Sequence, residues 1–120
     1  MLAAFYQKIK WFLPAIIWAA LILVASSIPG QDLPKQEIPH LDKLVHLGLY
    51  GILGFLIGLR RIPFYYSLLL AALFGLCDEL YQLQTPGRSM DPMDWLCDIL
   101  GAALGIYICQ WILKKRDERL

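Results

Sequence analysis

Several ionisable side chains interrupt otherwise apolar stretches, and their spacing would allow them to act together. Asp42 and His46 stand four positions apart, with Tyr50 one helical turn further along, and Asp94 and Asp98 repeat the spacing of four. Residues four positions apart lie on one face of a helix, so each set would point in one direction. A carboxylate beside an imidazole or a second carboxylate can bind a cation, move a proton or hold a polar ligand.

A third polar group completes the candidate site. Asp78 and Glu79, followed by Gln82, end another apolar stretch, and Arg88 comes shortly after. No Ser or Cys stands at motif spacing with His46, so an activated nucleophile is not predicted. The predicted binding residues are Asp42, Lys43, His46, Tyr50, Asp78, Glu79, Gln82, Arg88, Asp94 and Asp98. If the site is catalytic, the candidate groups are His46, Glu79 and Asp98.

The composition indicates a membrane protein. Of the 120 residues, 58% are hydrophobic and 18% are charged, with a formal net charge of +1. Soluble domains contain roughly 45–50% apolar residues, and a chain this short has too little interior to bury the excess. Lipid must therefore cover much of the surface, and the near-neutral charge argues against a nucleic-acid partner. Cys77, Cys97 and Cys109 lie inside apolar runs and are expected to be small buried hydrophobic residues.

Four apolar stretches predict an all-α fold, a bundle of four transmembrane helices that forms a single domain over residues 1–120. Each stretch is close to the roughly 17–25 residues that a spanning helix needs. The spans cover about residues 11–28, 44–59, 64–83 and 95–113. Turn-forming pairs separate them, namely Pro29-Gly30, Ile62-Pro63 and Pro86-Gly87. The second span is slightly short and can extend outward through Asp42 and Lys43.

Basic residues flank one side of this four-helix zigzag more often than the other. Eight lie on the side of both termini, namely Lys8, Lys10, Arg60, Arg61, Lys114, Lys115, Arg116 and Arg119. Three, Lys35, Lys43 and Arg88, lie on the opposite side. The positive-inside rule then predicts that both termini are cytoplasmic and that residues 29–41 and 84–94 face outward. The alternative is a cleaved signal peptide over residues 11–27, after which the other three spans would keep their orientation.

Because successive helices run in opposite directions, the polar groups of the last three spans fall at one outer end of the bundle. Small residues share their faces and allow close helix packing in membranes. These small residues are Gly51, Gly54, Gly58, Ala72, Gly75, Gly101 and Gly105. Six acids at this end, Asp91 included, are balanced only by Lys43 and Arg88, apart from His46. We therefore expect that some carboxyls are protonated or that a cation is bound.

Three of the acids also have a purely structural interpretation at helix starts. Asp91 fits the N-cap of the fourth helix, with Pro92 at its first position and Asp94 in its first turn. Asp42 is in the same way a candidate for the start of the second helix. These acids would then stabilise helices rather than bind a ligand.

The deeper acids and the tryptophans have structural alternatives of a different kind. Glu79 and Asp98 lie too deep in their spans for capping, so their alternative is a network that shares a proton or pairs with Arg88. The four tryptophans, Trp11, Trp18, Trp95 and Trp111, are expected to be interface anchors or lipid-facing side chains.

The same residues, taken in order, resemble those of the VanZ-like family of small bacterial integral membrane proteins. The matching motifs are Ser27-x-Pro29, Asp42-Lys43-x-x-His46 with Tyr50, Asp78-Glu79-x-x-Gln82, Pro86-Gly87-Arg88 and Asp94-x-x-x-Asp98-x-x-Gly101-x-x-x-Gly105. The resemblance implies a multi-pass protein of the bacterial cytoplasmic membrane, and a link to resistance against the glycopeptide antibiotic teicoplanin. It implies no settled biochemical activity, so the chemistry has to come from the residues.

Two functions from different classes fit these residues. The first is a binding protein, whose outward acid-rich pocket holds or helps to modify an envelope component such as a lipid headgroup, a cell-wall precursor or a glycopeptide. The second is a membrane-embedded hydrolase or transferase acting on a lipid-linked phosphate or sugar, with Mg²⁺, Mn²⁺ or Zn²⁺ as a candidate cofactor. Lys43 and Arg88 would then bind phosphate, and one acid would serve as base. The excess of acids and the absence of an obvious nucleophile favour the first function, and no compact metal-ligand motif supports the metal version of the second.

A proton or cation transporter fits less well. The cytoplasmic halves of the last three spans lack ionisable residues, so no relay crosses the bilayer. A four-helix chain of this size is also suited to pairing, so the sequence is compatible with an oligomer.

Overall fold

The computed structural model describes residues 1–32 and 40–120, and every regular element in these ranges is a helix. The elements are α1 (Leu2–Ser26), η1 (Gly30–Asp32), α2 (Leu41–Gly58), α3 (Phe64–Gln82) and α4 (Pro92–Glu118), of which η1 is a short 3₁₀ helix. The four α-helices are all long and apolar enough to cross a membrane. The predicted all-α, four-helix fold is therefore confirmed, and the chain is a multi-pass membrane protein.

The helices extend beyond the predicted spans, most of all in α1 and α4. α1 begins at Leu2 rather than near Trp11, and α4 continues to Glu118 rather than ending near Leu113. α2 begins at Leu41, so it includes the expected polar extension of the second span. In the most apolar 18-residue stretch of each helix, only 17 to 33% is buried within the chain. Most of the remaining surface is therefore available to lipid.

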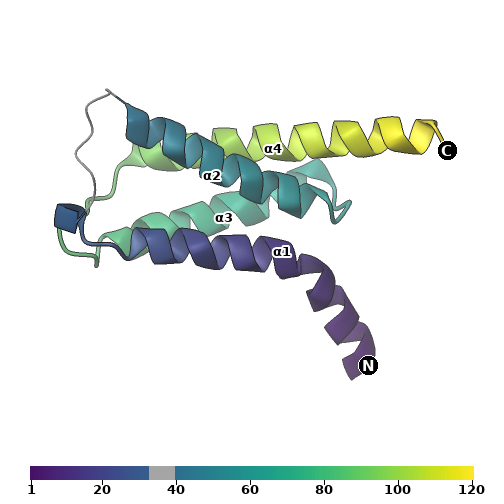
Figure 1. The fold of residues 1–120 in the computed structure, drawn as a ribbon, viewed down its shortest axis with the longest axis horizontal. Coiled ribbons are helices and arrows are strands. Elements are labelled where there is room, and N and C mark those ends of the chain that lie inside the picture. The colour runs from purple at the N-terminus through teal and green to yellow at the C-terminus, as the bar shows by residue number, and fades with distance from the viewer. Residues whose placement is uncertain (33–39) are drawn as a thin grey trace.

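The chain runs up and down the bundle, so that both termini lie at one end and the connections next to η1 and between α3 and α4 lie at the other (Figure 1). We call these the terminal end and the loop end. At the loop end the two connections touch, because the Gly30 N–H donates a hydrogen bond of 2.9 Å to the Pro86 carbonyl. Gly87 has a φ of +74°, a conformation that glycine adopts without steric cost. Lys35, one of the basic residues expected opposite the termini, lies outside the described residues.

Acidic residues stand at the starts of α2 and α4, as predicted. Asp91 caps α4, because its carboxylate accepts a hydrogen bond of 2.9 Å from the Met93 N–H and Pro92 occupies the first helical position. Asp42 stands at the start of α2 as predicted, in the first turn, whereas the residue that precedes the helix is His40, in a left-handed conformation with a φ of 62°.

α1 is the least regular of the four helices. Pro14 lies inside it, and a proline removes one backbone hydrogen bond and crowds the preceding turn. The N-terminal turns of α1 bend away from the bundle (Figure 1). Their large apolar residues, such as Phe5 and Tyr6, are exposed, and the first buried residue is Ala15. Only the second half of α1 therefore contributes to the core.

α2 and α4 run in the same direction, and their backbones are in direct contact along a seam of small residues. Gly54 lies against the backbone of Ala102, and Gly105 lies against the backbone of Gly51. A Cβ atom at Gly54, Gly101 or Gly105 would overlap backbone atoms of the opposite helix. The predicted small-residue faces of the second and fourth spans therefore meet each other, as close packing of membrane helices requires.

Two tryptophans differ from the predicted interface anchors. The indole N–H of Trp18 donates a hydrogen bond of 2.9 Å to a backbone carbonyl of α2, and that of Trp95 donates one of 3.0 Å to a backbone carbonyl of α3. Both side chains are partly buried and join neighbouring helices. Trp11 and Trp111 are exposed on the isolated chain, as expected for side chains that face lipid.

The cysteines also occupy different environments from one another. Cys109 is buried against Gly58, as predicted, whereas Cys97 is partly exposed and Cys77 is exposed. The expectation of burial is therefore wrong for Cys77. Its position on the outer face of α3 leaves lipid, rather than protein, to cover its side chain.

The α2–α4 seam predicts a clear difference between two glycine-to-alanine substitutions in α2. Gly54→Ala would drive a methyl group into the backbone of Ala102, and overpacking of this kind costs about 1–3 kcal/mol. Gly48→Ala meets nothing within 4 Å and gains helix propensity of about 1 kcal/mol. In detergent-solubilised protein, Gly54→Ala should lower the melting temperature and Gly48→Ala should not. Equal melting temperatures for the two variants would contradict the seam.

Candidate functional site

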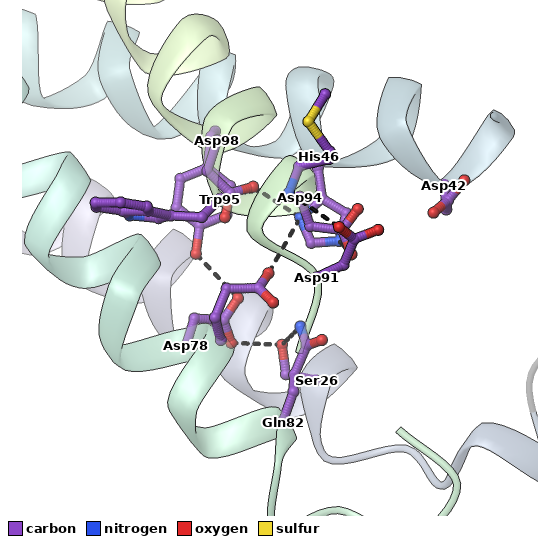
Figure 2. Close-up of polar contacts among 12 residues, drawn as sticks. Ser26, Asp42, His46, Asp78, Gln82, Asp91, Asp94, Trp95 and Asp98 are labelled. Atoms are coloured by element: carbon purple, nitrogen blue, oxygen red, sulfur yellow. Dashed lines mark hydrogen bonds and ion pairs between the residues drawn. The ribbon is translucent and has the colours of Figure 1, made fainter. Parts of the chain in front are cut away.

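Polar side chains from all four helices gather at the loop end of the bundle (Figure 2). They form three adjoining groups, each named after its central residue. These are the Lys43 group (Asp42, Lys43, Asp91, Asp94), the Asp78 group (Ser26, Tyr50, Asp78, Gln82) and the His46 group (His46, Glu79, Asp98). The groups differ in how many of their polar atoms have partners.

The Lys43 group places one ammonium among three carboxylates. Lys43 Nζ lies 3.1 Å from Asp42, 2.6 Å from Asp91 and 2.5 Å from Asp94. Its hydrogen bond to Asp91 is the largest of the effects that lower the pKa of that carboxyl below its usual value. Asp91 and Asp94 also lie in the cap and first turn of α4, where the helix dipole favours negative charge. These acids therefore have a structural basis in the first turns of α2 and α4.

The Asp78 group is a buried network of neutral donors around a carboxylate. The Ser26 hydroxyl donates a hydrogen bond of 2.5 Å to Asp78 Oδ1, and the Tyr50 hydroxyl donates one of 2.9 Å to Asp78 Oδ2. The Gln82 amide then donates a hydrogen bond of 3.2 Å to Ser26 Oγ. All four side chains are buried, so the network joins the end of α1 to α2 and α3.

The His46 group lies between the other two and is the least satisfied. His46 Nδ1 is 2.7 Å from Asp98 Oδ1 and 3.9 Å from Glu79 Oε1, while His46 Nε2 is 3.7 Å from Asp94 Oδ2. The side chains of Glu79 and Asp98 are completely buried. Within the described part of the chain, neither oxygen of Glu79 nor Oδ2 of Asp98 has a hydrogen-bond partner. These unpaired acceptors are the most unusual feature of the site.

A partly open cavity of about 330 Å³ adjoins these groups between α1, α2 and α3. It is lined by Ile22, Ala25, Ser26, Ile28, Leu41, Asp42, Val45, His46, Leu49, Tyr50, Asp78, Gln82 and Arg88. Aliphatic side chains form much of its wall, and polar groups of α1, α2 and α3 share the rest. His46 belongs both to the cavity wall and to the group that contains Glu79 and Asp98, so it connects the two.

Arg88 lines the cavity but does not pair with the buried acids. Its Nε donates a hydrogen bond of 3.0 Å to the Ile28 carbonyl, and its Nη2 donates one of 3.0 Å to the Ala25 carbonyl. A cation at these carbonyls complements the negative C-terminal end of α1. The structural alternative in which Arg88 pairs with Glu79 or Asp98 is therefore wrong.

The structure brings all ten predicted binding residues to the loop end. Nine belong to the three groups, and Arg88 lies on the cavity wall beside them. Their role in binding stays a prediction, because proximity alone does not assign it. Sequence reasoning missed Ser26, whose hydroxyl is central to the Asp78 group. The available signal was a serine at the end of the first span, at the same boundary as the acids.

At the terminal end the charged side chains are more exposed than those of the three groups at the loop end. Arg61 pairs with Asp117 at 2.7 Å, and both side chains are about half exposed. The guanidinium of Arg60 lies 5.9 Å from the ring of Trp11 and 5.1 Å from the ring of Phe12. A shallow hollow of about 520 Å³ lies beside Arg61. This end therefore resembles a solvated boundary of the bundle rather than a second polar site.

Comparison with known proteins identifies one family. The VanZ/LLP1 family model matches residues 7–114, which include nearly all of the described helices. No curated protein and no solved structure matches the chain. The match agrees with the motif resemblance and extends beyond it at both ends.

The Asp78 group predicts that a single hydroxyl has a measurable effect on stability. Tyr50→Phe keeps the ring and removes one of the two hydroxyl donors to Asp78, which should cost about 1–3 kcal/mol. Tyr107 is 62% exposed on α4, so Tyr107→Phe is a matched control and should be neutral. Unfolding in detergent, followed by tryptophan fluorescence, measures both. If Tyr50→Phe is as stable as Tyr107→Phe, the network does not stabilise the fold.

Proposed function

The chain belongs to the VanZ/LLP1 family, and we propose that it binds the polar headgroup of an amphiphilic envelope component, a membrane lipid or a lipid-linked cell-wall precursor. The observation that carries this proposal is the 330 Å³ cavity between α1, α2 and α3, which combines aliphatic walls with buried polar side chains. Ligand pockets in proteins typically have volumes of about 300–1,000 Å³ and this mixture of linings. The cavity is at the small end of this range, which suits a headgroup better than a whole lipid.

The residues that line the cavity support an amphiphile, rather than a soluble metabolite, as the ligand. Ile22, Val45 and Leu49 provide an apolar surface on α1 and α2 that an acyl or isoprenoid chain can contact. Asp42 and Gln82 provide acceptors at the same cavity. A ligand with an apolar chain and a polar head can satisfy both kinds of surface at once.

The charge of the lining favours a headgroup with hydroxyl or amine donors. Asp42, Asp78 and Gln82 supply acceptor oxygens, whereas Arg88 uses two of its N–H groups on the carbonyls of Ala25 and Ile28. Carboxylates and amide oxygens accept hydrogen bonds from sugars, glycerol and ammonium groups. The proposal therefore covers cationic and polyhydroxyl headgroups, including the sugars of a glycopeptide such as teicoplanin.

We also propose that the protein lies in the bacterial cytoplasmic membrane with both termini in the cytoplasm. The eight basic residues near the terminal end support this orientation through the positive-inside rule. The cavity and the polar groups would then face the outer side, where cell-wall precursors and glycopeptides act. The link to teicoplanin resistance belongs to the same proposal.

An enzyme is the second candidate function, and one observation favours it. His46, Glu79 and Asp98 adjoin the cavity through His46, so reactive groups would lie beside a bound headgroup. A hydrolase or transferase acting on a lipid-linked phosphate or sugar could use such groups as base or acid. Among the described residues no Ser or Cys is hydrogen-bonded to His46, so binding is the better-supported function.

Occlusion of the cavity tests the binding proposal. Val45 lines the cavity, whereas its neighbour Leu44 lines a separate groove between α2 and α4. Val45→Phe should narrow the cavity and reduce binding by at least about tenfold, which corresponds to about 1.4 kcal/mol. Leu44→Phe adds a ring of the same kind elsewhere on α2 and should bind normally.

Native mass spectrometry of the detergent-solubilised protein can measure this binding. The probes are phosphatidylethanolamine, with its amine, phosphatidylglycerol, with its hydroxyls, and teicoplanin. The proposal expects that at least one probe binds the wild type and the Leu44→Phe variant and is lost from Val45→Phe. Equal retention by Val45→Phe and Leu44→Phe would rule out the cavity as the binding site.

Reporter fusions test the orientation independently of any ligand. A fluorescent protein fused after Leu120 should be fluorescent, and alkaline phosphatase fused there should be inactive, because the C-terminus is expected in the cytoplasm. Alkaline phosphatase inserted between Ser89 and Met90, in the α3–α4 connection, should be active. The opposite pattern of activities would place the cavity on the cytoplasmic side.

A further inference from the structure

The buried acids of the His46 group lack the partners that the other acids have. Asp78 receives two hydroxyl donors, and Asp94 receives the ammonium of Lys43. Glu79 and Asp98 have completely buried side chains, and three of their four oxygens have no hydrogen-bond partner among the described residues. A buried carboxylate without a partner is costly, and a cation between Glu79 and Asp98 would supply the partner that both side chains lack.

We propose that His46, Glu79 and Asp98 bind one divalent transition-metal ion, Mn²⁺ or Zn²⁺, beside the cavity. One ligand atom from each of these residues lies within 4.8 Å of the other two. One imidazole nitrogen and two carboxylate oxygens form a donor set that both ions accept. This site goes beyond headgroup binding, and its test does not depend on any lipid.

The geometry requires only small adjustments to hold the ion. Donor atoms that lie about 2.0–2.2 Å from one ion are at most about 4.4 Å apart. His46 Nδ1 is 2.7 Å from Asp98 Oδ1 and 3.9 Å from Glu79 Oε1, which is already in this range. Metal binding would displace the proton between His46 and Asp98, since the ion takes the lone pairs that the proton bridges.

The charge of the group also matches a divalent ion. Two ionised carboxylates and a neutral imidazole carry a charge of −2, which a divalent cation cancels inside the bundle. Lys43 does not contribute here, because its ammonium is held by Asp42, Asp91 and Asp94. The neutral result removes the cost of two like charges in a low-dielectric site.

The surroundings of His46 are those expected around a metal-binding imidazole. His46 Nε2 faces Asp94 Oδ2 at 3.7 Å, and Asp94 is held in turn by Lys43 at 2.5 Å. This contact is longer than a hydrogen bond, but it places a carboxylate on the side of Nε2, where a proton on Nε2 would leave Nδ1 free to bind metal. The Lys43 group therefore acts as support for the metal-binding group.

The position of His46 gives the proposed ion access to the cavity. His46 lines the cavity, while Glu79 and Asp98 lie behind it. Three protein ligands leave at least one coordination position free for water or a ligand oxygen. The proposed ion would therefore lie next to the headgroup of an amphiphile in the cavity.

Metal content of the purified protein tests this proposal. The chain should be purified with an affinity tag that contains no histidine, incubated with Mn²⁺ or Zn²⁺, desalted and analysed by elemental mass spectrometry. Wild type should retain about one ion per chain, and Glu79→Gln, Asp98→Asn and His46→Gln should each retain less than about a tenth of this amount. Asp78→Asn is the matched control, because Asp78 is equally buried but lies outside the donor set, and it should retain the ion.

A second measurement distinguishes loss of the metal site from failure of a variant to fold. Chelation should lower the melting temperature of wild type and leave that of Glu79→Gln unchanged, since binding to the folded state raises stability only where the site exists. Wild type without a stoichiometric ion after loading would overturn the proposal, as would equal retention by Glu79→Gln. Val45→Phe should keep the ion even if it loses lipid, so failure of the metal site and failure of headgroup binding are distinguishable.

Discussion

The close parallel packing of α2 and α4 is the constraint on which the polar site depends. Gly101 lies against Leu47 and Gly105 lies against Gly51, so the register of the two helices is set by backbone contact. The same register brings His46 to Asp98 and Lys43 to Asp94, which lie about one and two turns of α4, respectively, nearer the loop end than Gly101. Larger residues in the seam would separate the helices and lengthen these ion-pair distances. The glycines therefore position the charged residues, although they bind nothing themselves.

Given this register, the buried acids differ in the partners that remain within reach. The Lys43 side chain is long enough to contact the acids at the starts of α2 and α4. Its ammonium pairs with these acids and not with the deeper Glu79 and Asp98. Asp78 faces α1 and α2, where Ser26 and Tyr50 supply neutral donors. Glu79 is the next residue, turned by about 100° around α3, and it faces His46 instead. One residue of helical rotation thus separates a satisfied carboxylate from an unsatisfied one.

Much of this arrangement could be predicted from local features of the sequence. Spacings of four residues reveal shared helix faces, and glycine pairs reveal a packing face, because both follow from the geometry of a single helix. The hydrogen-bond partner of each polar side chain could not be predicted in this way. Arg88 binds carbonyls that are accessible only because α1 ends beside the α3–α4 connection, and Ser26 reaches Asp78 only because α1 docks there. These contacts depend on tertiary packing.

The attachment of α1 explains why a cavity lies on one side of the site and a closed group on the other. α1 contains no glycine and forms no seam. Its second half packs Ala15 and Ile22 into the core, and hydrogen bonds join it to α2 through Trp18, to α3 through Ser26 and to the α3–α4 connection through Arg88. Without a glycine seam the α1 backbone does not come into direct contact with its neighbours at the loop end, so space remains there, and this space is the cavity. His46 lies at the boundary between this open side and the tightly packed α2–α4 side, which is why it reaches both the cavity and the buried acids.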